Sequence, residues 1–254
     1  LEHRRQRQMC IRDRFKTSLS IPHFKPSIAN ATAQRLSQCF QAIHKLRPHL
    51  FENQKGLEFI SHLEFPQNWG LGSSSTLINN LAQWANVDAY KLLALTFGGS
   101  GYDIACAQNP YPITFQKNLK SSKIEKAVFN PSFKDKLFFV HRNQKQDTRV
   151  AIAAYQALKN TKNLDFSELN IITNALLQHS TLEVFESLIT EHEKLIGKLI
   201  QQAPLKTTHF SDYNGAIKSL GAWGGDFFLA SGNEQQYFKE KGYNTIIPFK
   251  KMVL

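Results

Sequence analysis

The residues best suited to chemistry lie in three glycine-rich segments. The first, at 66–75, reads Pro-Gln-Asn-Trp-Gly-Leu-Gly-Ser-Ser-Ser and stands between an alternating apolar run and a helical pattern. Glycines let a backbone approach a ligand closely, and the start of a helix offers unpaired N–H groups and a positive dipole end. Serine hydroxyls add further donors. The segment suits a polyphosphate, although a tight turn with a serine cap explains the same residues.

Two known phosphate-binding patterns are excluded for this first segment. A Walker loop requires a Lys-Ser or Lys-Thr pair after its glycines, and no such pair follows Gly72. A dinucleotide-binding fingerprint requires a third glycine, which is missing. On the residues alone, phosphate binding and a plain turn both remain open.

For the second and third segments too, the residues alone allow both a binding role and a purely structural one. The second reads Gly-Gly-Ser-Gly-Tyr-Asp at 98–103, and its Asp103 precedes an apolar run, so that a helix N-cap is the favoured role from position alone. The third reads Gly-Ala-Trp-Gly-Gly at 221–225. Its glycines allow a second backbone approach to a phosphate, or they simply stop a helix.

The patterns around these segments predict a mixture of helices and strands. Strands and helices alternate without a regular β-α-β order, which favours an α+β fold over a doubly wound sheet. Helical spacing and alternation mark the elements. We expect helices at 28–46, 73–85, 88–95, 148–158, 166–178, 182–202 and 233–241, and strands at 57–65, 113–116, 124–129, 137–141, 227–230 and 244–249.

The composition is that of an ordinary globular protein, with 42% hydrophobic and 20% charged residues in a chain of 254. No stretch approaches 18 uninterrupted apolar residues, so no membrane-spanning helix and no membrane partner are expected. Cys10, Cys39 and Cys106 are odd in number and far apart, which excludes a disulfide framework and favours a cytoplasmic setting.

The net charge of +11 does not indicate nucleic-acid binding. Five arginines lie in the first 14 residues, and the remaining excess is thinly spread lysine. A nucleic-acid partner would need a concentrated basic stripe or a recognisable module, and neither is present. Leu1–Asp13 has no apolar periodicity, so we expect residues 1–14 to be a disordered or non-native tail.

Taken together, the three segments resemble the motifs of the GHMP kinases, the superfamily of galactokinase, homoserine kinase, mevalonate kinase and phosphomevalonate kinase. The first resembles the ATP-binding motif. Gly98–Ala105 resembles the segment with the catalytic aspartate, in the Ser-Gly-x-Asp form of mevalonate and phosphomevalonate kinases. Its Gly-Tyr-Asp-Ile-Ala sequence also resembles the one after which a bacterial subgroup is named. Lys218–Asp226 resembles the C-terminal glycine motif, and Thr148-Arg149 is a weaker fourth match.

This resemblance implies a two-domain α+β kinase that uses ATP and Mg²⁺. Asp103 would be the catalytic residue, and the acceptor would be an alcohol or phosphate of a small molecule, with the Ser-Gly-x-Asp form favouring a mevalonate-pathway acid. We expect an ATP-binding domain at 15–134 and a second domain at 135–254. The implied phosphate-binding residues are Gly70, Leu71, Gly72, Ser73, Ser74, Ser75, Gly221, Gly224 and Gly225, with Ser74 also on the metal.

Two departures from the family pattern qualify this prediction. The family's opening strands with a substrate motif are not visible, so we expect an incomplete N-terminal domain and the acceptor stays unidentified. Mevalonate kinases carry a magnesium-binding Glu one short helix before the catalytic Asp, whereas Tyr90–Ala94 holds no acid. Magnesium would then rest on the phosphates and a serine. The alternative function is a nucleotide-binding protein without kinase turnover.

Overall fold

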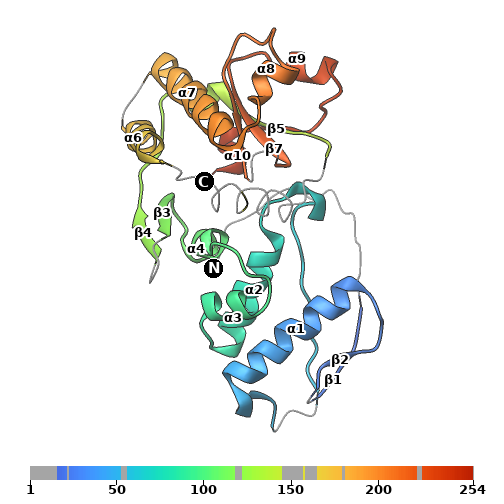
Figure 1. Cartoon of the computed structure of the whole chain (residues 1–254). Coiled ribbons are helices and arrows are strands. Elements are labelled where there is room, and N and C mark those ends of the chain that lie inside the picture. The colour runs from blue at the N-terminus through green and yellow to red at the C-terminus, as the bar shows by residue number, and fades with distance from the viewer. Residues whose placement is uncertain are drawn as a thin grey trace. The chain divides into compact units, whose positions relative to one another are not determined.

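The computed structural model describes residues 16–21, 23–52, 56–117, 122–144, 157, 165–178, 181–221 and 225–253. The chain divides into two compact units, Leu1–Gln67 with Leu71–Lys126, and Asn68–Gly70 with Ala127–Leu254 (Figure 1). The tail at 1–14 lies outside the described residues. So does the helix predicted at 148–158, apart from Ala157, which is helical.

Four α-helices lie in the described part of the first unit. They begin where the sequence supplies a cap, and the Asn30 side chain accepts from Ala33 N at 2.8 Å while that of Asp88 accepts from Lys91 N at 2.8 Å. The apolar stripes of these helices meet in one core with Phe24 and Phe51. The helices are α1 (Ala31–Leu46), α2 (Ser73–Ala85), α3 (Ala89–Leu95) and α4 (Tyr102–Gln108).

The strands of the first unit are two antiparallel hairpins. The prediction at 113–116 is confirmed, and the strand predicted at 124–129 lies a little earlier. The hairpins are β1 (Leu19–Ser20) with β2 (Lys25–Pro26) and β3 (Ile113–Lys117) with β4 (Ser122–Lys126). Single turns of 3₁₀ helix lie at η1 (Pro48–Phe51) and η2 (Gln67–Trp69).

The strand predicted at 57–65 is wrong. The segment has no ladder partner among the described residues, and a strand exists only through pairing with a neighbour. Its apolar side chains stay exposed, Ile60 at 86%. Phe59 alone of the alternating set finds aromatic contacts, with Phe40 at 5.0 Å and Trp84 at 4.6 Å between ring centroids. The alternating pattern therefore predicted a strand here, but the structure leaves most of the apolar face of this segment exposed.

A four-stranded antiparallel sheet, in the order β6-β7-β5-β8, forms the centre of the second unit. All five residues of β5 are buried, as a central strand covered on both faces requires. Phe138 packs against Phe238 at 5.8 Å, while its neighbour Phe139 stacks on Phe249 at 5.9 Å. The strands are β5 (Leu137–His141), β6 (Ile217–Ser219), β7 (Phe227–Ser231) and β8 (Ile246–Pro248).

Helices cover this sheet and complete an aromatic core around Phe210, Phe228 and Phe238. The helices predicted at 166–178, 182–202 and 233–241 are confirmed with shorter ends. The short elements at Leu205–His209, Ile217–Ser219 and Phe249–Met252 were not predicted, because segments this short show no periodic pattern. The second unit contains η3 (Lys134–Lys136), α6 (Ser167–Leu176), α7 (Leu182–Ile200), α8 (Leu205–His209), α9 (Gln235–Glu240) and α10 (Phe249–Met252).

Across the part of the chain that the structure describes, no helix combines the length and apolarity needed to cross a bilayer.

Gly215 is a packing point in the second unit. A Cβ built there would overlap the backbone oxygen of Ser231, which also accepts from Tyr213 Oη at 2.6 Å. The Gly215 carbonyl is itself held by Lys206 Nζ at 2.7 Å. Backbone therefore meets backbone here, and neither partner has room to move.

We expect Gly215→Ala to destabilise the chain by about 1–3 kcal/mol, the usual cost of an overpacked site. Thermal unfolding followed by circular dichroism measures the loss. Gly242→Ala is the matched control, because its surroundings are open and only its positive φ of 87° is strained. A loss at Gly215 no larger than that at Gly242 would contradict the packing assignment.

Candidate phosphate-binding and active site

The first glycine segment ends where α2 begins. Gly72 is the N-cap residue, with φ 73° and ψ 27°, a left-handed conformation that glycine adopts without strain. Its carbonyl accepts from Thr76 N at 3.0 Å, the first bond of the helix. The backbone N–H groups of Ser73, Ser74 and Ser75 therefore have no acceptor within α2. A 13-residue helix directs three free donors and its positive dipole end outward from Gly72.

The serines do not cap this helix, contrary to the simple-turn interpretation. Gly72 occupies the cap position and no side chain caps α2. Ser73, Ser74 and Ser75 lie inside the first turn, and their hydroxyls have no hydrogen-bond partner in the described part of the chain. Ser74 is exposed and the other two are half-buried. Three hydroxyls thus remain available beside three free backbone donors.

The second segment forms a tight loop that ends at α4. Gly101 is the N-cap, in the left-handed conformation with φ 85°. A Cβ there would lie 2.9 Å from the Tyr90 ring, so glycine is required by packing as well as by backbone angle. Asp103 follows in the first turn of α4. The N-cap role that position alone favoured for Asp103 is therefore wrong, because Gly101 holds the cap.

The two loops meet within the first unit. A Cβ built on Gly72 would lie 3.5 Å from Asp103 Cγ and 3.7 Å from Asp103 Oδ2. The Asp103 carboxyl therefore lies close to Gly72, at the start of α2. Two segments that are about thirty residues apart in sequence come together because α2 packs on α4.

Asp103 remains accessible, yet the surrounding chain removes enough water to raise the pKa of its carboxyl. No Lys or Arg of the described residues forms an ion pair with it. A raised pKa makes this carboxylate a better proton acceptor than an ordinary surface aspartate.

The hairpin of β3 and β4 holds the second loop from the side. The Tyr102 ring meets Phe115 edge-on at 5.6 Å, and Lys117 Nζ donates to the Gly99 carbonyl at 3.2 Å. Burial raises the pKa of Tyr102 to about 12, so its hydroxyl stays protonated at neutral pH. These contacts hold the loop that leads into Asp103.

The start of the first glycine segment is anchored in the second unit. A Cβ on Gly70 would overlap the Asp226 carboxyl, so a larger residue would displace that carboxyl and would also be strained at φ 62°. Trp69 packs edge-on against Phe227 at 5.4 Å and tilts against His141 at 6.3 Å. Gly70 thus lies beside Asp226, the residue that directly follows the third glycine segment.

The third segment is described at its two ends. Gly221 has φ 62°, and a Cβ on Gly225 would overlap the Leu220 carbonyl oxygen and lie 3.6 Å from Gly221 Cα. The two ends of the segment therefore touch. Gly224 and Trp223 lie outside the described residues, as do Thr148 and Arg149 of the fourth sequence match.

The donor set around Asp103 fits a magnesium ion that is carried by phosphates. Among the described residues, no group of three or more His, Cys, Asp or Glu side chains could hold a metal. Asp103 and Ser74 offer one carboxylate and one hydroxyl. Mg²⁺ keeps several waters and is commonly bound through one or two carboxylates together with substrate phosphates. The short helix before Asp103 offers no acid: its Tyr90 has a buried hydroxyl without a hydrogen-bond partner in the described part of the chain.

Comparison with known proteins gives structural matches only. No protein-family model and no curated protein matches the sequence. The Lin0012 protein from Listeria innocua superposes with a TM-score of 0.52 at 17% identity, over 86% of this chain and 79% of that one. The L. major mevalonate kinase, solved in complex with R-mevalonate, has a TM-score of 0.50 at 16% identity, over 86% of this chain and 78% of that one.

This chain shares its fold with a mevalonate kinase. The likeness confirms the predicted α+β, GHMP-kinase-like fold. At 16–17% identity it shows the fold and not the subgroup, so membership of the Gly-Tyr-Asp-Ile-Ala group stays a prediction.

The sequence motifs missed two residues that make polar contacts near the glycine segments, Lys117 and Glu193. Lys117 carries no pattern that could have marked its bond to Gly99. Glu193, in contrast, left a signal, because it occupies the buried stripe Phe185, Ile189, Glu193 and Gly197 of α7, where an apolar residue is expected.

The raised pKa of Asp103 predicts an effect on stability. Because the folded carboxyl holds its proton more tightly than the unfolded one, its contribution to stability falls as pH rises past its ordinary pKa of 3.8. Asparagine stays neutral, so Asp103→Asn should gain melting temperature over the parent as pH goes from 4 to 7. Calorimetric scans at both pH values test this. A loss of stability that grows toward pH 7 would contradict it.

Proposed function

We propose that this protein transfers the γ-phosphoryl group of ATP to a hydroxyl or phosphate oxygen of a small molecule. The observation that carries the proposal is the contact between Gly72 and Asp103, which puts a candidate base beside the open start of a helix. The shared fold with a mevalonate kinase supports the same activity at the level of the family.

The phosphates would bind at the start of α2. Backbone N–H groups of Ser73, Ser74 and Ser75 donate to phosphate oxygens, and the helix dipole favours their negative charge. Gly70 and Gly72 have no side chain to obstruct a phosphate, and Leu71 between them is proposed as a phosphate contact on the strength of the motif. Gly221, Gly224 and Gly225 are proposed as further phosphate contacts on the strength of the motif. Mg²⁺, when bound with ATP, would neutralise developing charge on the phosphates, with Ser74 as its protein ligand.

Asp103 would act on the acceptor. Its carboxylate accepts the proton of the acceptor hydroxyl while the acceptor oxygen bonds to the γ-phosphorus. The bond from that phosphorus to the bridging oxygen breaks, and ADP leaves with the electron pair. Positioning and electrostatics supply most of the rate in such transfers, so the rigid support of Asp103 matters as much as its basicity.

The substrate class is proposed from two resemblances. The Ser-Gly-x-Asp form at 100–103 and the fold shared with a mevalonate kinase both favour a small hydroxy acid of the mevalonate type. We further propose a cytoplasmic location and no nucleic-acid or membrane partner. The free thiols of Cys39 and Cys106 support a reducing setting.

Gly72→Val should weaken ATP binding roughly tenfold or more, about 1.4 kcal/mol. The branched side chain would be strained at φ 73° and would stand between the free N–H groups and the Asp103 carboxyl. Isothermal titration calorimetry measures the affinity. Gly242→Val controls for strain alone, since its φ is also positive but it lies in the second unit with open surroundings. Unchanged ATP affinity in a folded Gly72→Val variant would remove the phosphate-loop assignment.

Asp103→Asn should lower kcat by about 10²–10⁴ and leave ATP affinity unchanged, because asparagine cannot take the proton. ADP release with a panel of small hydroxy acids measures turnover. Asp88→Asn is the control, since it alters a capping carboxylate of α3 outside the site. Turnover within threefold of the parent would end the catalytic role. Tight ATP binding without ADP release from the unsubstituted chain would favour the nucleotide-binding protein without turnover.

A further inference from the structure

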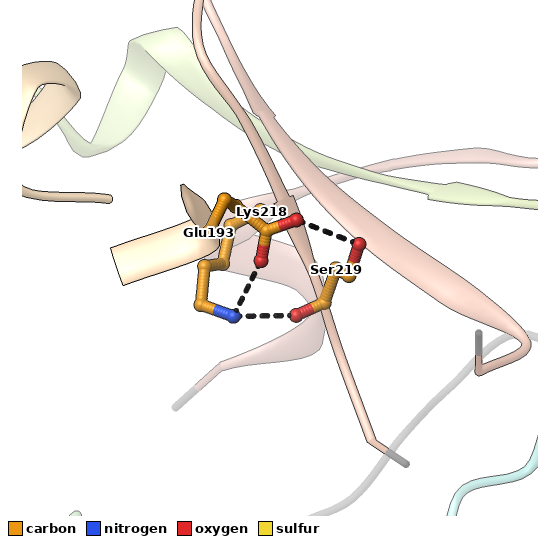
Figure 2. A network of polar contacts seen from close by, with 3 residues as sticks. All are labelled: Glu193, Lys218 and Ser219. Atoms are coloured by element: carbon orange, nitrogen blue, oxygen red, sulfur yellow. Dashed lines mark hydrogen bonds and ion pairs between the residues drawn. The ribbon is translucent and has the colours of Figure 1, made fainter. Parts of the chain in front are cut away.

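A charged pair is buried in the second unit, next to the third glycine segment. Lys218 Nζ lies 2.9 Å from Glu193 Oε1, and Ser219 Oγ donates to Glu193 Oε2 at 2.8 Å (Figure 2). The Lys218 ammonium also donates to the Ser219 carbonyl at 2.7 Å. The Glu193 side chain is 3% exposed and that of Lys218 is 16% exposed. Both oxygens of one buried carboxylate are thus used on two consecutive residues of β6.

Stability does not explain a glutamate at this place. The rest of the buried stripe on α7 is Phe185, Ile189 and Gly197, which need no desolvation of charge. Removing two charges from water costs several kcal/mol per ion, and apolar residues of similar volume often serve as well or better. The neighbouring His192 does not compete for the carboxylate, because burial and the Lys218 charge lower its pKa to about 4.

The pair acts on the outer edge of β6, which has no second strand beside it among the described residues. Ser219 lies opposite Phe228 in the β6–β7 register, and Leu220 N donates to Phe227 O. Ladder bonds alternate along an antiparallel pair, so the Ser219 carbonyl points away from β7. Lys218 takes that outward carbonyl and Glu193 takes the Ser219 side chain. The last residue of β6 is therefore held from the outside as well as from within the sheet.

The glycine segment begins two residues later. Leu220 follows Ser219, and the Leu220 carbonyl and Gly221 Cα are the atoms against which Gly225 packs. A shift of Ser219 would carry Leu220 with it and would open the contact with Gly225. The geometry of both described ends of the segment thus depends on the atoms that Glu193 holds.

We infer that Glu193 is a positioning residue for the third glycine segment: through Lys218 and Ser219 it fixes the backbone of Gly221, and with it that of Gly225. The inference rests on the proposed function, in which these glycines contact phosphate. Phosphate contacts made by backbone groups are sensitive to small displacements, since a site must be held within a fraction of an ångström. An ionic clamp with three directional bonds specifies such a position better than an apolar contact would.

The same helix supplies a matched control. Glu186 lies two turns before Glu193 and accepts from Ser231 Oγ, at the end of β7 that is farther from the glycine segment. Glu186→Gln and Glu193→Gln each weaken one glutamate–serine contact between α7 and the sheet. We expect both to lower the melting temperature, whereas Glu193→Gln alone should raise the Kd for ATP about tenfold, with Glu186→Gln within twofold of the parent.

A double variant separates positioning from folding. Glu193→Leu with Lys218→Met removes both charges and leaves no unpaired ion, so it should recover stability relative to Glu193→Gln. The inference predicts that its ATP affinity stays about tenfold weak, and calorimetric titration with ATP on the folded double variant measures this. This variant also serves if Glu193→Gln does not fold.

The outcomes distinguish the inference from the function on which it rests. Weak ATP binding in Glu193→Gln and the double variant, with normal binding in Glu186→Gln, supports the positioning role. Parent-like ATP affinity in the double variant, or equal losses in both glutamine variants, overturns it while leaving ATP binding intact. Absence of ATP binding by the unsubstituted chain overturns the proposed function and the inference together.

Discussion

The close approach of Asp103 to Gly72 is the constraint on which the candidate site depends. It requires glycine at the start of α2, because the backbone there has a positive φ of 73°, a conformation that strains any residue with a side chain. It also requires α4 to begin at Gly101, whose left-handed backbone and contact with Tyr90 bring Asp103 into the first helical turn. Two glycine caps, each demanded by its backbone angle, thus place one acid beside one set of free donors.

Each of the two units has a core of its own. In the first unit, α2 and α4 are held by apolar residues of four helices, so the site is built on rigid elements and not on loops alone. In the second unit, an aromatic core stabilises the sheet whose strands β6 and β7 flank the third glycine segment. Within this unit, Gly70 lies beside Asp226, the residue that directly follows the third glycine segment.

Polar contacts in the second unit have a different role from that of its apolar core. Glu186 and Glu193 lie on one face of α7, and each accepts a hydrogen bond from a serine near the end of a strand. Buried carboxylates are costly and directional, so their value lies in fixing positions more than in adding stability. α7 thereby holds the end of β6 next to the third glycine segment and the end of β7 that is farther from it.

The amino-acid sequence by itself determined the elements with long periodic patterns, such as α2, α7 and β5, because repeated apolar spacing is a local property. It also determined the three glycine segments and their candidate chemistry, since residue types decide what a backbone can approach. Tertiary structure alone decided that 57–65 is no strand, because pairing needs a partner elsewhere in the chain. It decided as well that Gly101, not Asp103, caps α4, that Asp103 meets Gly72, and that Glu193 holds Lys218 and Ser219. Such contacts join residues far apart in sequence, and their distances follow only from how the packed helices and strands meet.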